Sequence, residues 1–279
     1  MKKPVVLGIG EIVWDCLPEG KALGGAPVNF AYHAMKLGAD SYPVSAVGDD
    51  ELGAETLAAC KSYGLRTDYL QHPGLPTSRV LVSLDAQGVP KYEILENVAW
   101  DALDATPEVL ALAAKADAVC WGSLAQRSPR SRKAILQILD AVPAAAMRVF
   151  DINIRQHYFS KEVIEASLER ANVLKLNEDE LPVVMEITGL KGIPEIVDRF
   201  SLDYLIYTCG AKDSEVHGPA GLLSHIDTPK VKVVDTVGAG DSFTAAFIAS
   251  ILQDETPAAA HRRAVDLSAL VCRSHGAIV

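Results

Sequence analysis

Residues 235–244 read DTVGAGDSFT, and an apolar run follows them to about Leu252. This pattern predicts a tight Gly-Ala-Gly turn that opens an apolar helix. Small residues let the backbone approach a ligand closely, and the first amides of a helix have no partner within the helix. With the helix dipole added, the amides of Gly238, Ala239 and Gly240 form a ready site for an oxyanion.

Asp241 stands at the same helix start, where the dipole favours its ionised form. A carboxylate placed there can orient a hydroxyl group and accept its proton, while the amides hold charge that develops on a transferred phosphoryl group. Phosphoryl transfer depends on such positioning and charge neutralisation more than on covalent help. A glycine turn followed by an acidic residue is also how an ordinary helix begins, so the turn alone leaves both interpretations open.

Outward from this stretch, the chain alternates apolar runs of strand length with amphipathic stretches. In one of them, Ile135, Ile138 and Leu139 recur at helical spacing. Strands that alternate with helices predict a mostly parallel sheet covered on both faces. The expected strands are Val5–Ile9, Tyr42–Val47, Ala118–Trp121, Arg148–Ile152, Asn172–Leu176 and Tyr204–Thr208, and the expected helices include Leu52–Tyr63, Arg130–Leu139 and Lys161–Arg170.

One region breaks this alternation. Two strand-like runs, Arg79–Leu84 and Val89–Leu95, are joined by residues 85–88, which read DAQG and suit a hairpin turn. The segment Ile12–Lys21 is also strand-like and is not followed directly by a helix. We interpret these pieces as a small β-layer that covers a cleft, with an irregular excursion at the sheet edge as the alternative. The expected organisation is one domain over residues 1–279, with a β-lid from about residues 12–22 and 77–100.

Composition narrows the functional class. Of 279 residues, 49% are hydrophobic, and no window approaches the roughly 18 uninterrupted apolar residues that a membrane helix needs. The net charge of −10, without a basic block, argues against a nucleic-acid partner but permits a small anionic ligand. The five cysteines are scattered and form no CxxC pair, so we expect free thiols and a cytoplasmic protein.

The 235–244 stretch resembles the C-terminal signature of the ribokinase-like sugar kinases, also called the phosphofructokinase-B family. Further motifs in the family's order are GGAPVN at 24–29, GDDELG at 48–53, DINIR at 151–155, NEDE at 177–180 and TCG at 208–210. The motifs most like bacterial fructokinases are GEIVWD at 10–15, GSLAQR at 122–127 and RQH at 155–157. The resemblance implies a three-layer α/β/α fold with a mostly parallel central sheet and a small β-sheet lid, and a cleft at the carboxyl ends of the strands.

The resemblance also implies an activity: an ATP- and Mg²⁺-dependent kinase that transfers the γ-phosphoryl group to a sugar hydroxyl. D-fructose, giving fructose 6-phosphate, is the expected substrate, with ribose and 2-keto-3-deoxygluconate as alternatives. A non-catalytic sugar- or nucleotide-binding regulator on the same fold is the other class, supported only by Asp213. A dinucleotide-binding enzyme, suggested by the glycines of residues 8–10, lacks the third glycine. An exposed lid edge strand could pair with another copy, so a homodimer through the lid is the candidate assembly.

Sugar contacts follow from the resemblance by position. Asp15 can accept hydrogen bonds from two neighbouring hydroxyls, and Asn29 offers both a donor and an acceptor. On spacing alone, Asp15 is equally a solvated turn acid, Asn29 a helix-start residue and Arg155 a surface ion-pair partner. The implied sugar set is Asp15, Gly24, Gly25, Asn29, Gln126 and Arg155.

Nucleotide contacts also follow by position. In the family, a pair such as Asn177 and Glu180 organises the water around Mg²⁺, which commonly keeps several waters; the same pair could also cap a helix. Thr208 and Gly210 would meet phosphate or ribose. Asp213 stands where the family usually has glycine, and Asp is tolerable there if the backbone has a positive φ.

Two lysines and a set of backbone carbonyls stand near these positions. Lys175 and Lys212 are either counter-charges for phosphate or merely solvated. Many family members bind a monovalent cation such as K⁺ beside the anion hole. The candidates for that cation are Asp235 and the carbonyls of Val237, Val271, Ser274 and Gly276.

Overall fold

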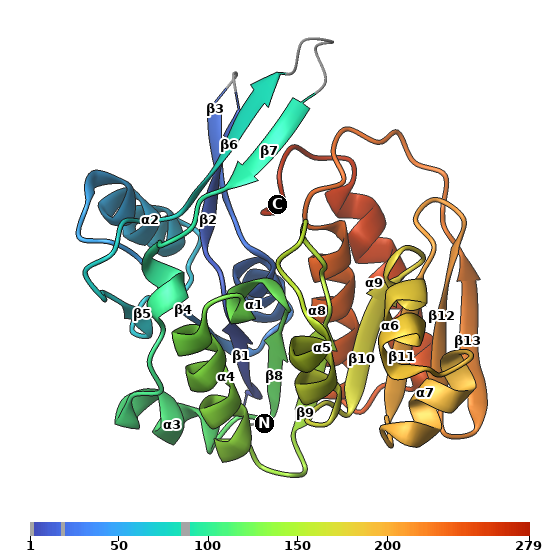
Figure 1. The fold of residues 1–279 in the computed structure, drawn as a ribbon. Helices are drawn as coiled ribbons and strands as arrows, with labels where there is room; N and C mark the ends of the chain where they lie inside the picture. Colours follow the sequence, from blue (N-terminus) through green and yellow to red (C-terminus); the bar gives the residue numbers. More distant parts are fainter. Residues whose placement is uncertain (1–2, 18–19, 85–89) are drawn as a thin grey trace.

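A large twisted sheet with helices on both faces forms the body of the molecule (Figure 1). The structure is a computed structural model and describes residues 3–17, 20–84 and 90–279. The large sheet contains β1 (Val5–Ile9), β4 (Asp40–Ala46), β5 (Leu70–Gln71), β8 (Ala118–Trp121), β9 (Met147–Asp151), β10 (Val173–Asn177), β11 (Tyr204–Thr208), β12 (Asp213–Gly218) and β13 (Gly221–Asp227). Their order across the sheet is β13-β12-β11-β10-β9-β8-β1-β4-β5.

The sheet is parallel from β11 to β5, as the alternation of strands and helices predicted. All six strands expected in it are present, with bounds that differ from the predicted ones by at most two residues. The hairpin of β12 and β13 continues the sheet antiparallel at one edge, and the sequence reasoning did not predict it. Because the parallel strands run in one direction, their carboxyl ends meet along one edge, where a ligand cleft is expected.

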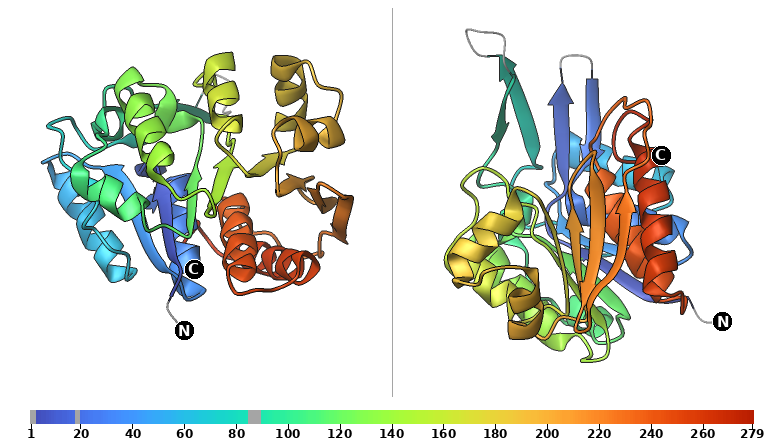
Figure 2. Two further views of the ribbon diagram at one scale, coloured as in Figure 1. Left: turned by 90° about the horizontal axis from the view of Figure 1, so that it is seen from below. Right: turned by 90° about the vertical axis from the view of Figure 1, so that its right-hand side faces the viewer.

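Helices cover the two faces as separate layers (Figure 2). One face carries α3 (Pro107–Ala113), α4 (Pro129–Ala141), α5 (Lys161–Leu168), α6 (Glu180–Thr188) and α7 (Ile193–Arg199); the other carries α1 (Ala26–Lys36), α8 (Ala239–Ile251) and α9 (Pro257–Val271). The first layer packs its apolar stripes on large residues such as Trp121 and Phe150. The second packs tightly through small residues and through Phe30 and Phe247. The helix α2 (Glu51–Ser62) joins α1 in a third, smaller cluster.

A second sheet of four strands stands beyond the carboxyl ends of the parallel strands (Figure 1). It consists of β2 (Val13–Leu17), β3 (Gly20–Gly24), β6 (Arg79–Leu84) and β7 (Pro90–Ile94), in the order β3-β2-β6-β7. The two strands of the predicted hairpin are therefore present and pair antiparallel. The turn expected at 85–88 lies outside the described residues. The edges of this sheet are β3 and β7, and a homodimer formed through either edge stays a prediction.

A buried arginine ties the root of β7 to the body of the molecule. Arg127, just after the 3₁₀ turn η2 (Leu124–Gln126), forms a two-point ion pair with Asp101 at 2.8 Å and donates to the carbonyl of Leu95. Its guanidinium also stacks over the rings of Trp100 and Tyr158. The two charged side chains are only 7% and 10% exposed. Desolvated charges of this kind are stable only as a pair, so the junction holds the second sheet at one position.

Arg127→Met is expected to lower the free energy of unfolding by ~3 kcal/mol or more, because it leaves the buried Asp101 carboxylate without its partner. Urea unfolding followed by circular dichroism measures the change. Arg130→Met is the matched control, since its ion pair with Asp104 is about half exposed and should contribute less than ~1 kcal/mol. Equal losses in the two variants would contradict the structural role of Arg127.

All five cysteines are free thiols, as predicted. Within residues 3–17, 20–84 and 90–279, no helix has the length and apolar character that crossing a membrane requires. The cytoplasmic location stays a prediction.

Candidate functional site

The Gly-Ala-Gly turn opens α8 as expected. Gly238 is the N-cap residue in the left-handed region, with φ of 75°, a conformation that glycine adopts without strain. A Cβ atom at this position would lie 2.3 Å from the Cβ of Ala277, so the turn packs directly on the C-terminal segment. That segment is held against α1, where His33 and Tyr32 bond the carbonyls of Ala277 and Val279.

Asp241, the third residue of α8, receives a hydrogen bond from a residue 212 positions earlier in the chain. The side-chain amide of Asn29 on α1 donates to Asp241 Oδ2 over 2.8 Å. Asn29 is 3% exposed, and its Oδ1 has no hydrogen-bond partner among the described residues. The amide therefore orients the carboxylate and keeps one acceptor free for a ligand hydroxyl.

Burial raises the pKa of Asp241 to about 6, and the negative charge of Asp151 adds to that rise. The hydrogen bond from Asn29 and the positive charges of Lys175 and Arg155 act in the opposite direction. The expectation that the helix dipole decides the charge of Asp241 was incomplete, because desolvation outweighs it. The carboxylate is still ionised at neutral pH, and its pKa lies close enough to neutrality for proton transfer.

The amides of the turn are not equivalent. Ala239 N–H donates to the carbonyl of Thr236 over 3.2 Å and so already has a partner. Gly240 and Asp241 are the second and third residues of α8, positions at which helix geometry provides no acceptor within the helix. Oxyanion binding at this turn therefore relies on Gly240 and Asp241 more than on the predicted Ala239.

Two of the predicted sugar residues, Asp15 and Gly24, belong to neighbouring strands of the second sheet. A Cβ added at Gly24 would lie 3.3 Å from Asp15 Oδ2, so the backbone runs close to this carboxylate. Burial raises the pKa of Asp15, while Arg155 lowers it. Arg155 acts in the same direction on Asp241. The charge of Arg155 thus acts on both carboxylates, which indicates that Asp15 and Asp241 lie in the same part of the molecule.

The loop that carries Arg155 is held in an unusual backbone conformation. Asn153 and Gln156 both have positive φ, 48° and 51°. Left-handed conformations of non-glycine residues carry strain and concentrate at functional sites. Arg155 itself is exposed, and its guanidinium donates a hydrogen bond to the carbonyl of its neighbour Ile154. The guanidinium is therefore open to a ligand.

Gln126, another predicted sugar residue, has its side-chain amide nitrogen engaged within the protein. Its side-chain amide is 2% exposed and donates to the carbonyl of Gly122 and to the hydroxyl of Ser167. Only its Oε1 has no hydrogen-bond partner among the described residues. The side chain thus serves the packing between η2 and α5, and contact with a ligand would require the free Oε1.

Asn177 and Glu180 form a reciprocal cap at the start of α6. Asn177 Oδ1 accepts from the N–H of Glu180, and Glu180 Oε2 accepts from the N–H of Asn177. The second oxygen of Glu180 accepts from the N–H of Ile154 over 2.9 Å. This is the capping interpretation that the sequence left open. Because both oxygens of Glu180 accept N–H groups and the residue is 3% exposed, it does not fit as a direct metal ligand.

The next predicted phosphate residues follow β11. Thr208 ends this strand, and Gly210 is exposed with φ of 54°. Asp213 begins β12 and is not among the residues of positive φ, so the proposed reason for tolerating aspartate there is wrong. The positive φ lies at Gly210 instead. Lys212 is exposed and pairs with Glu178 at 2.6 Å.

The candidate monovalent-cation residues surround the same turn. The Asp235 carboxylate accepts from the N–H groups of Val237 and Gly276, which lower its pKa against the effect of burial. The carbonyl of Val271 accepts from the N–H of Ser274. Each of these oxygens keeps a second lone pair, so the set suits a cation that prefers carbonyl oxygens and one carboxylate.

Two buried charged residues were missed or undervalued by sequence reasoning. Glu11, two residues after the end of β1, is 3% exposed and accepts from the N–H of Ala26, while its Oε2 has no partner among the described residues. Burial raises its pKa to about 7, and the charge of Asp241 adds to the rise. Lys175 is buried rather than solvated and pairs with Asp151. The sequence does contain a signal for these two buried charges: each is a charged residue within an apolar strand or just beyond its end.

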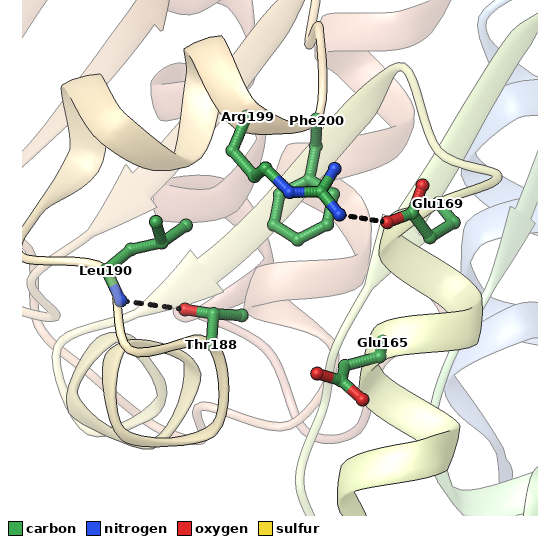
Figure 3. A pocket seen from close by; sticks show the side chains of 6 residues that line it. All are labelled: Glu165, Glu169, Thr188, Leu190, Arg199 and Phe200. Atoms are coloured by element: carbon green, nitrogen blue, oxygen red, sulfur yellow. Dashed lines mark hydrogen bonds and ion pairs between the residues drawn. The ribbon is translucent and has the colours of Figure 1, made fainter.

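Two surface cavities lie away from the start of α8. One of about 300 Å³ lies between α5, α6 and α7 and is bordered by an exposed ion pair of Arg199 and Glu169 (Figure 3). A groove of about 1050 Å³ runs beside the root of β7, along Arg127 and the start of α4. Neither cavity is lined by Asp15, Asn29 or Asp241. Both are therefore separate from the candidate site at the start of α8.

Comparison with known proteins agrees with this geometry. The chain matches the pfkB family carbohydrate kinase over residues 16–279. It therefore belongs to that family. A fructokinase of Salmonella typhimurium is 30% identical over 272 residues, covering 89% of this chain and 85% of the relative. Fructokinase-2 of Solanum habrochaites is 29% identical, covering 96% and 88%.

Solved structures show the same fold. The fructokinase of Xylella fastidiosa with bound ATP superposes with a TM-score of 0.84 at 21% identity, covering 99% of this chain and 94% of that one. The fructokinase of Vibrio cholerae O395 bound to fructose, ADP and calcium has a TM-score of 0.80 at 23% identity, covering 99% and 95%. The ribokinase-like fold expected from the sequence is confirmed, and this pfkB kinase is a phosphotransferase that acts on a sugar.

Gly238→Ala is expected to lower kcat/KM of this kinase by roughly 10²-fold, the effect of a misplaced reacting group. The new Cβ would clash with Ala277 and strain a backbone of positive φ, so the start of α8 must shift. A coupled assay of ADP release measures the loss. Gly189→Ala is the control, since its φ is 72° but no atom lies within 4 Å of the added Cβ. Equal activity in the two variants would contradict the tight turn.

Proposed function

We propose that this pfkB kinase is an ATP-dependent fructokinase that transfers the γ-phosphoryl group to the 6-hydroxyl of D-fructose. The observation that carries the proposal is the hydrogen bond from Asn29 to Asp241 at the start of α8, in a site shared with Asp15 and Arg155. The relatives named fructokinase support fructose over other sugars.

Asp241 acts as the general base. Its ionised carboxylate accepts the proton of the sugar hydroxyl as the oxygen attacks the γ-phosphorus, and the bond from that phosphorus to the β-γ bridging oxygen of ATP breaks. Asn29 keeps the carboxylate aimed by donating to Oδ2, and Oδ1 is left to receive the proton. Because the pKa of Asp241 is about 6, the base is available at neutral pH and is lost in acid.

The start of α8 stabilises the transferred group. The N–H groups of Gly240 and Asp241 lie at the positive end of the helix dipole, where charge develops on the equatorial phosphoryl oxygens. Glycine at 238 and 240 keeps side chains away from this position. Arg155, exposed and held by its strained loop, adds a positive charge on the sugar side.

Metal ions would act from the nucleotide side. Mg²⁺ neutralises charge on the β- and γ-phosphates when it is bound. Asn177 and Glu180 fit only a contact through water, because their oxygens already accept backbone N–H groups. K⁺ would be held by Asp235 and by the carbonyls of Val237, Val271, Ser274 and Gly276.

The nucleotide would lie along the carboxyl ends of β10 and β11. Thr208 and Gly210 offer backbone and hydroxyl groups to phosphate or ribose, and Asp213 follows them. Val233 and Val237 are exposed apolar residues just before α8, and the neighbouring Val234 is tied to the end of α9 through the carbonyl of Cys272. This apolar surface suits the adenine base.

The sugar would be enclosed by the second sheet. Asp15 on β2 and the backbone at Gly24 and Gly25 border the site from that sheet. Gly25 is required because a Cβ there would lie 2.4 Å from the carbonyl oxygen of Glu11. The second sheet then acts as a lid that excludes water while phosphoryl transfer takes place.

The proposal is tested by incubating the protein with ATP, Mg²⁺ and each of a dozen sugars, with ADP release followed spectrophotometrically. Fructose should have the highest kcat/KM, and phosphorus NMR should identify fructose 6-phosphate. A preference for ribose or 2-keto-3-deoxygluconate would reassign the substrate. Binding of sugar and ATP without release of ADP would instead favour a regulator on the kinase fold.

Asp241→Asn is expected to lower kcat by roughly 10²–10⁴-fold, the usual contribution of a general base. The side chain keeps its shape and its place next to Asn29, so the melting temperature should not fall. Steady-state kinetics and thermal unfolding at pH 8 provide the two measurements. Near-normal turnover would refute the assignment of the base.

Asp15→Ala is expected to raise KM for the sugar by roughly 10–100-fold, the value of hydrogen bonds to a charged group, and to leave KM for ATP unchanged. Kinetics with each substrate varied in turn separate the two constants. Asp68→Ala removes an exposed carboxylate that pairs with Arg66 and serves as the control. A loss confined to ATP would mean that Asp15 faces the nucleotide.

A further inference from the structure

Lys175 is a buried cation in the middle of the large sheet. It lies on β10, is 6% exposed, and its Nζ lies 3.2 Å from Asp151 Oδ1 on the neighbouring β9. Lysine is almost never fully buried unless it is paired. Burial lowers the pKa of Lys175, but Asp151, Glu180 and Asp241 outweigh that effect and raise it. Lys175 is therefore charged, and three carboxylates share it.

The pair is joined to the first turn of α8. Asp151 Oδ2 accepts a hydrogen bond from the hydroxyl of Thr244 over 3.0 Å. Thr244 lies in the second turn of α8, three residues after Asp241, and its hydroxyl is also 3.0 Å from the carbonyl oxygen of Gly240 in the first turn. A Cβ atom added at Gly240 would lie 3.1 Å from Lys175 Nζ, so the ammonium group lies directly beside the backbone of the anion-binding turn. One buried ion pair thus contacts α8 at two points.

The charges around Asp241 explain why a cation is needed there. Asp151 repels the Asp241 carboxylate, while Lys175 and Arg155 attract it and Asn29 donates a hydrogen bond to it. Glu11, just after β1, is a further acidic neighbour, and the charges of these carboxylates also raise the pKa of the Cys120 thiol on β8. Lys175 is the buried cation in this set, whereas Arg155 is exposed.

We propose that Lys175 is a positioning residue for phosphoryl transfer: paired with Asp151 beneath Gly240, its ammonium group fixes the first turn of α8 and keeps Asp241 negatively charged. The inference rests on the proposed role of Asp241 as the base. Lys175 acts through Asp241 and through the backbone of the turn, and it exchanges no proton with the substrate. A buried ion pair that served folding alone would leave the titration of Asp241 unchanged.

The test compares the pH dependence of kcat/KM in three proteins. The wild type should lose activity in acid with a midpoint near pH 6, the pKa of Asp241. Asp151→Asn removes a repelling charge, so its midpoint should fall below that of the wild type. Adding Lys175→Met to this variant removes the attracting charge and leaves no unpaired carboxylate at residue 151. Its midpoint should therefore lie about one pH unit or more above that of Asp151→Asn.

Controls separate this inference from the proposed function. Thermal unfolding confirms that each variant is folded at the pH of the assay, and Lys191→Met, on an exposed loop, should keep the wild-type midpoint. Equal midpoints in Asp151→Asn and in the double variant would overturn the role of Lys175, even if Asp241→Asn is inactive. Full activity of Asp241→Asn would overturn the base and this inference together.

Discussion

The packing of α1 against α8 is the constraint on which the site depends. It brings the Asn29 amide within 2.8 Å of the Asp241 carboxylate, across 212 residues of sequence. Close approach is possible because α8 is built largely from small residues. On its other side α1 lies directly on β1, where a Cβ at Gly8 would lie 2.0 Å from the carbonyl oxygen of Pro27. If the two helices moved apart by even one methyl group, the base would lose the donor that aims it.

Charge balance within that packing decides the chemistry. The region holds more acidic than basic groups, and burial alone drives carboxylates toward the neutral form. Asp241 stays ionised near neutral pH because Asn29, Lys175 and Arg155 lower its pKa, against the rise caused by burial and by the charge of Asp151. Glu11 has a pKa of about 7, because burial and the charge of Asp241 outweigh its backbone hydrogen bonds and the charge of Arg155. At both carboxylates burial is the largest cause of the raised pKa, and their polar and charged neighbours oppose it only in part.

A few contacts hold the segments of the site together. Arg127 and Asp101 hold the root of the second sheet, and Asp235 and His33 hold the C-terminal segment against the Gly238 turn. Glu180 does the same for the Arg155 loop by accepting from Ile154 N–H. Residues that sequence motifs associate with ligands therefore also maintain the shape of the site, and a substitution at Glu180 alters both.

Local pattern determined most of the fold. Apolar runs of strand length and helical spacing located all six predicted strands of the large sheet and the lid hairpin, because burial on both faces imposes that pattern. The glycine turn and Asp241 were likewise readable from residues 235–244. Only the tertiary structure decided that Lys175 is buried and charged, that the Gln126 amide points inward, that Asp213 lies in an ordinary strand, and that burial outweighs the helix dipole at Asp241. These properties depend on which charges and backbone groups meet across distant segments, and a linear sequence carries no record of those distances.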